Sequence, residues 1–85
     1  MKKYEQVLEE VAELYPDSLK CDGFDEAIIG YSTDGLIVYD VSRMIDILIR
    51  RDSMGHIDAL EYLHVNVFGA YMGETQPLYM YPPNN

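Results

Sequence analysis

The 85-residue sequence contains no tryptophan, one cysteine and only six lysine and arginine residues. The single cysteine, Cys21, excludes an intramolecular disulfide bond and suits a reducing cytoplasm. Fifteen aspartate and glutamate residues outnumber the basic residues, so the formal net charge at pH 7 is −9. Because such a surface repels phosphates, direct binding of DNA, RNA or anionic lipid is excluded.

Long apolar runs and catalytic motifs are also missing. No apolar run approaches the ~20 residues of a membrane-spanning helix, and the N-terminus lacks the basic and then apolar pattern of a secretory signal. Phosphate-binding glycine loops, a G-x-S-x-G nucleophile motif and paired metal-binding cysteines are absent as well. We therefore expect a cytoplasmic protein that is not an enzyme, uses no cofactor and does not contact a membrane.

The composition indicates one small globular domain, because 48% of the residues are hydrophobic. A chain of this length buries only about 60 to 65% of the surface that its unfolded form exposes. A partner or a second copy would therefore add useful stability. We expect a single domain over residues 1–81 and a disordered tail over residues 82–85.

The negative charge is unevenly distributed along the chain. Arg51 is the last basic residue, and from Asp52 onward every formal charge is negative, in a segment that holds four of the eight tyrosines. Carboxylates on a rigid scaffold imitate phosphates and compete with nucleic acids for a basic protein. The alternative interpretation is that the charge only keeps a small domain soluble.

The hydrophobic pattern predicts an amphipathic helix over residues 2–14, which Pro16 should end. Residues 27–31 and 36–39 form two apolar runs that are separated by a turn with Gly35, which predicts a β-hairpin. Both strands are apolar at consecutive positions, whereas a sheet with one wet face alternates. Either both faces are covered within the monomer or one awaits a partner, so we expect a homodimer through the sheet.

Two helices and a strand are predicted in the C-terminal half. Asp40 should cap a helix that begins at Val41, and a further helix should begin near Gly55 and end before Gly73. A last strand is expected over residues 78–81. The order helix, hairpin, two helices, strand predicts an α+β domain, with about three helices packed on a small, mainly antiparallel, three-stranded sheet.

Tyrosines and acids of the C-terminal half are the candidate partner-binding residues. Tyrosine is frequent at binding hot spots because it buries a large area and keeps a hydroxyl group for hydrogen bonding. Within a strand, Tyr79 and Tyr81 would share one face, and the alternative is that this face belongs to the core. The predicted partner-binding residues are Tyr71, Tyr79, Tyr81, Glu74, Asp58 and Glu61.

Two groups of residues contain possible metal ligands, but their spacing along the chain argues against a metal site in each case. Asp22, Asp25 and Glu26 lack the alternating order of a calcium-binding loop. His56 and His64 would lie about 12 Å apart along one helix, which is too far for a single ion. No metal site is predicted.

Three segments carry a resemblance to known sequences: residues 23–30 (GFDEAIIG), Tyr39-Asp40, and residues 66–74 (NVFGAYMGE) followed by Pro77. Together they resemble a group of small uncharacterised proteins from bacteriophages and related mobile elements, over roughly residues 19–80. The chain departs from that group at Gly55, where a Ser or Thr helix cap is expected. The resemblance implies a phage setting, in which small acidic proteins are often inhibitors of host machinery or host defence. It assigns a role to no residue.

The leading hypothesis is a non-enzymatic, phage-type protein that binds and inhibits a host protein in the host-cell cytoplasm. Its acidic, tyrosine-rich surface would meet a basic surface, for which a nucleic-acid-handling defence complex is the expected example. One alternative is a protein that binds or sequesters a small ligand, with a pocket at the junction of sheet and helices. Another is a structural or assembly helper.

Overall fold

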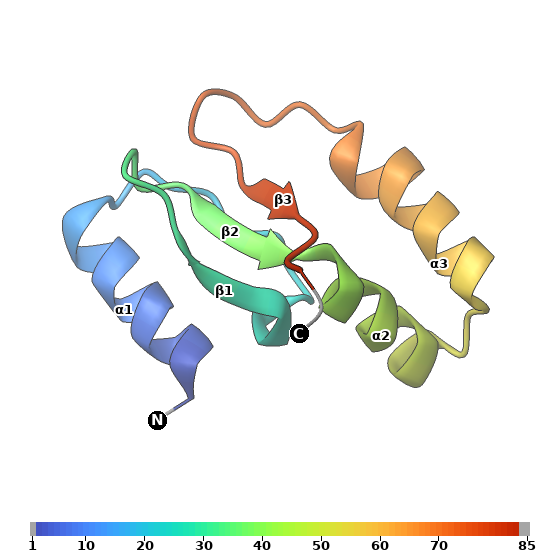
Figure 1. Cartoon of the computed structure of the whole chain (residues 1–85). Coiled ribbons are helices and arrows are strands. Elements are labelled where there is room, and N and C mark those ends of the chain that lie inside the picture. The colour runs from blue at the N-terminus through green and yellow to red at the C-terminus, as the bar shows by residue number, and fades with distance from the viewer. Residues whose placement is uncertain (1, 84–85) are drawn as a thin grey trace.

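A computed structural model describes residues 2–83 as a three-stranded sheet with three α-helices (Figure 1). The helices are α1 (Lys3–Leu14), α2 (Val41–Asp52) and α3 (His56–Leu63), and the strands are β1 (Ile28–Tyr31), β2 (Ile37–Asp40) and β3 (Leu78–Met80). A 3₁₀ turn, η1 (Asp25–Ala27), precedes β1, and a π-helical turn, η2 (His64–Phe68), continues α3. The predicted α+β class and element order are confirmed. The tail predicted over 82–85 lies partly outside the described residues.

The β1–β2 hairpin forms where the sequence predicts it. Gly35 has a φ of 81°, and its N–H donates to the Ser32 carbonyl over 2.8 Å. A side chain at Gly35 would also run into the ring of Tyr15. Ile28 pairs with Tyr39, and a bulge at Ile29 precedes the pairs that join the rest of the two strands.

The sheet is mixed, so the prediction of a mainly antiparallel sheet is wrong for β3. Its order is β1-β2-β3, and β3 runs parallel to β2, with Tyr39 paired to Tyr79. The cause is the connection between these strands: α2 and α3 carry the chain away from the end of β2 and back to its start (Figure 1). Such a crossover joins parallel strands, whereas an antiparallel neighbour needs only a short turn.

The inner face of the sheet carries the core. We define it by Tyr31, Ile37, Tyr39 and Tyr79, whose register places them on one side. Tyr31 lies 6.0 Å from the ring of Tyr15, which follows α1, and Tyr39 packs against Tyr79 at 5.8 Å. Val11 of α1, Met44 and Leu48 of α2, and Leu63 of α3 belong to the same buried cluster.

The start of α2 follows the sequence prediction and the end of α3 does not. The carboxylate of Asp40 accepts from the Arg43 N–H over 3.3 Å, which is the predicted N-cap. The α-helix of α3 ends at Leu63, and the π-helical turn then ends at Phe68. Gly73 is therefore not the helix cap that the sequence indicates, although its φ of 98° is positive. It lies in the loop that leads to β3.

The outer face of the sheet is formed by Gly30, Val38, Leu78 and Met80, which the register places opposite the core. Leu78 and Met80 are each 42% exposed, and Val38 is partly exposed. The sequence left open whether both faces are covered. The structure covers only the inner face, and it leaves an apolar outer face in contact with solvent.

Candidate functional site

The exposed side of α3 carries a hollow of about 310 Å³. Its two carboxylates, Asp58 and Glu61, lie one helical turn apart and both are exposed. The hollow is lined by Met54, Asp58, Glu61, Tyr62, Val65 and Asn66. It therefore combines negative charge with apolar and aromatic walls.

The π-helical turn η2 closes one end of this hollow. It contains Val65, which is 69% exposed, and Asn66, whose side-chain amide donates to the Tyr62 carbonyl over 3.2 Å. This hydrogen bond fixes Asn66 on the helix surface. Single π-helical turns are rare in proteins, but those that do occur often lie at functional sites. The sequence analysis did not identify Met54, Tyr62 and Val65 as site residues. A signal was present for two of them, because Glu61, Tyr62 and Val65 follow Asp58 by three, four and seven residues and so share one helix face with it.

Tyr71, Glu74 and Tyr81 belong to the segments that flank β3. Tyr71 is 79% exposed and Tyr81 is 60% exposed, while Glu74 lies in a turn between them. Gln76 accepts from the Met72 N–H over 3.2 Å and so shapes this loop. Within residues 2–83, no hydrogen bond joins these three residues to Asp58 or Glu61, and none of them lines the hollow.

Tyr79 points to the inside of the protein. Its ring lies 4.7 Å from that of Phe68 and 5.8 Å from that of Tyr39, and Phe68 in turn meets His64 edge-on at 5.1 Å. Burial raises the pKa of Tyr79 well above its ordinary value. Tyr79 thus anchors β3 to η2, and only part of its side chain remains for a partner.

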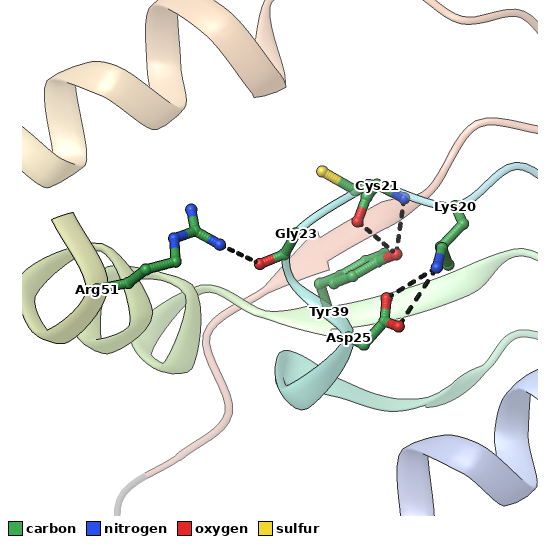
Figure 2. Close-up of polar contacts among 6 residues, drawn as sticks. All are labelled: Lys20, Cys21, Gly23, Asp25, Tyr39 and Arg51. Carbon is green, nitrogen blue, oxygen red and sulfur yellow. Dashed lines mark hydrogen bonds and ion pairs between the residues drawn. The ribbon is translucent and has the colours of Figure 1, made fainter.

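Tyr39 ties the central strand to the loop before β1 (Figure 2). Its hydroxyl oxygen accepts from the Cys21 N–H over 2.7 Å, and the hydroxyl group donates to the Cys21 carbonyl over 3.4 Å. Burial is the main cause that raises the pKa of Tyr39, and burial also raises the pKa of the Cys21 thiol. The Tyr39 hydroxyl therefore has a structural role, because both of its hydrogen bonds are to the backbone of Cys21.

A second cavity, of about 450 Å³, lies between α1, η1 and α2. Arg51 is fixed at its edge, since Nη1 donates to the Gly23 carbonyl over 2.7 Å (Figure 2). Its Nη2 also lies 3.2 Å from Asp52. Arg50 has no ion-pair partner within residues 2–83. The cavity is lined by Tyr4, Gly23, Asp25, Glu26, Ile47, Arg50 and Arg51.

Charge in this second cavity is mixed. Asp25 pairs with Lys20 over 3.2 Å, and the guanidinium of Arg51 lies 5.4 Å from the ring of Phe24. Two arginines and two carboxylates therefore line the cavity together with the apolar Ile47. The cavity suits a small polar ligand better than a strongly charged one.

Within residues 2–83, no group of three or more His, Cys, Asp or Glu side chains gathers in a way that could hold a metal ion. None of the helices in this part of the chain has both the length and the apolar character that crossing a membrane requires. Comparisons of the chain with known protein families, with curated proteins and with solved structures found no match.

Proposed function

We propose that this protein is a non-enzymatic binding protein that docks onto a basic surface of another protein. The hollow on α3 carries the proposal, because it places Asp58 and Glu61 beside apolar and aromatic side chains. A lysine or arginine side chain of the partner would lay its aliphatic stem along Met54 and Val65. Its charge would then meet both carboxylates, with the ring of Tyr62 available for a cation–π contact.

The surroundings of the hollow favour a basic partner. From Asp52 to the C-terminus the chain has no lysine or arginine, and the net charge of the whole chain is −9. This field attracts a basic surface and accelerates its association. Exposed ion pairs alone contribute about 0 to 1 kcal/mol each, so the apolar walls and the exposed Tyr71 and Tyr81 are needed for specific binding.

The resemblance to phage proteins supports a host protein as the partner, and inhibition as the outcome. A nucleic-acid-handling defence complex is the natural target class, because its basic surface evolved to hold phosphates. An acidic protein that covers this surface would block the nucleic acid. The protein would act in the host-cell cytoplasm.

Binding to a panel of basic nucleic-acid-handling host proteins tests the proposal. The affinity should fall as salt rises from about 50 to about 200 mM, because the attraction is electrostatic. The double variant Asp58→Asn, Glu61→Gln should bind about tenfold more weakly, which corresponds to two modest ion pairs. Glu9→Gln with Glu13→Gln is the matched control, since it removes the same charge from the exposed face of α1.

Two results would contradict this function. One is binding that does not weaken with salt. The other is an equal loss in the α1 control variant, because that outcome would assign the effect to net charge rather than to the hollow.

The 450 Å³ cavity favours a second candidate, a protein that binds or sequesters a small ligand. Its volume is in the range of ligand pockets, and Tyr4 is available for stacking and Arg50 for donating hydrogen bonds to a polar ligand. Native mass spectrometry of the gently purified protein would reveal a retained molecule. A bare protein mass, together with an unchanged mass after incubation with a metabolite mixture, would argue against this candidate.

A further inference from the structure

The exposed strand positions of the outer sheet face carry no charged side chain, which is unusual for this chain. Gly30, Val38, Leu78 and Met80 form its surface. Asp40 pairs with Met80 at the end of the strands, but it is buried and its carboxylate is engaged with Arg43. In a chain with fifteen acidic residues, a surface without a carboxylate requires an explanation.

Gly30 lies on this face, and nothing within the monomer requires a glycine at this position. Its φ is outside the left-handed region, so its backbone conformation does not require glycine. A Cβ atom at Gly30 would meet no atom within 4 Å, so close packing in the monomer does not require glycine either. Glycine weakens a strand interior, and it often marks a place where another molecule approaches the backbone closely.

The charge of the chain decides which molecule approaches. A basic partner has no electrostatic attraction to an uncharged face and would bind to the acidic surfaces instead. Two copies of this chain, each of charge −9, repel each other over most of their surfaces. The outer face is where two copies meet without opposing their carboxylates.

We infer that two copies of this chain associate through their outer sheet faces, with Leu78 and Met80 of one copy seated over Gly30 of the other. A two-fold axis makes such an interface self-complementary. Three strands of about four residues span roughly 10 by 13 Å between backbone axes, which is small beside the ~800 Å² per partner of a standard interface. The dimer is therefore weak, with dissociation in the micromolar range or above.

Salt has opposite effects on this dimer and on a complex with a basic partner. Salt screens the repulsion between two acidic copies, so the dimer tightens as salt rises. Binding to a basic protein weakens under the same conditions. Sedimentation velocity from about ten micromolar to about one millimolar protein, at about 50 and about 200 mM salt, measures the self-association without any partner. A monomer at every concentration and both salt levels would overturn the inference and leave the proposed function untouched.

Variants of the outer face locate the contact. Leu78→Glu adds a carboxylate to each copy and should weaken the dimer at least tenfold, whereas Leu14→Glu makes the same change at an exposed site on α1 and should not. Gly30→Val should fold with an unchanged or higher melting temperature, because nothing in the monomer opposes its side chain. It should nevertheless weaken the dimer. Equal effects of Leu78→Glu and Leu14→Glu, or a Gly30→Val dimer as tight as the wild type, would refute this packing.

Discussion

The hydroxyl oxygen of Tyr39 accepts a 2.7 Å hydrogen bond from the backbone N–H of Cys21, eighteen residues earlier in the chain. Tyr39 is fully buried in the middle strand, so this contact fixes the loop before β1 against the centre of the sheet. The loop has no regular structure from residue 15 to residue 24. Its position therefore depends on a few such contacts, of which Leu19 N–H to the Thr75 carbonyl is another.

Tyr39→Phe should destabilise the protein by about 1 to 3 kcal/mol. The phenyl ring keeps the packing, but the Cys21 N–H loses its partner in a part-buried place. The free energy of unfolding in urea measures the loss. Tyr81→Phe is the control, because Tyr81 is exposed, and it should change the stability little. Equal stability of Tyr39→Phe and the wild type would show that the hydrogen bond is dispensable.

Asp40→Ala should cost about 1 kcal/mol or more, since Asp40 caps α2 and accepts from the Arg43 N–H. Asp34→Ala in the hairpin turn removes the same charge from an exposed site and serves as the control. Chemical denaturation of both variants compares them. A smaller loss for Asp40→Ala than for Asp34→Ala would argue against the cap as a source of stability.

The protein should lose stability at alkaline pH. The folded-state pKa values of Tyr39 and Tyr79 are raised, mainly by burial, above the ordinary tyrosine value of about 10. The folded state keeps these protons where the unfolded state releases them. Their contribution to stability is therefore complete below about pH 10 and is lost as the pH rises through the folded pKa values.

Ultraviolet absorbance of phenolate, recorded with circular dichroism across the alkaline range, checks this prediction. The phenolate signals of Tyr39 and Tyr79, whose folded-state pKa values are raised by burial, should appear only as the fold is lost. Tyr79→Phe should reduce the dependence of stability on pH. If all tyrosines ionise together while the fold persists, the burial of Tyr39 and Tyr79 does not control their titration.

Much of the fold could be predicted because local chemistry decides it. Asp40 caps α2 and Gly35 turns the hairpin through interactions with near neighbours in sequence. The direction of β3 could not be predicted, because it depends on where two intervening helices return the chain. Helix α3 shows a second limit. The π-helical turn at residues 64–68 changes the rotation per residue, and the helix that was predicted to end before Gly73 ends at Phe68.

The candidate site was predictable only in part, for a related reason. Residue type identified Asp58 and Glu61, since acids near tyrosines suggest contact with a basic protein. The hollow between them also needs Met54, which comes from the turn before α3, and Val65, which the π-helical turn positions. Tyr79 was predicted with Tyr71 and Tyr81 as a partner-binding residue, and the alternative was that its strand face belongs to the core. Strand pairing with Tyr39 turns it towards the core.

Gly35 and Gly30 should respond in opposite ways to the same substitution. Gly35→Ala forces an L-residue into a φ of 81° and places its methyl group against the ring of Tyr15, so it should destabilise the protein by more than about 1 kcal/mol. Gly30→Ala has neither problem and should be neutral or stabilise the monomer by up to about 1 kcal/mol, because alanine loses less backbone entropy on folding. Thermal and urea unfolding at low micromolar protein, where the weak dimer is dissociated, compare the two variants. A clear loss of stability in Gly30→Ala would mean that the monomer itself requires this glycine, and it would remove the main reason to place a second copy over it.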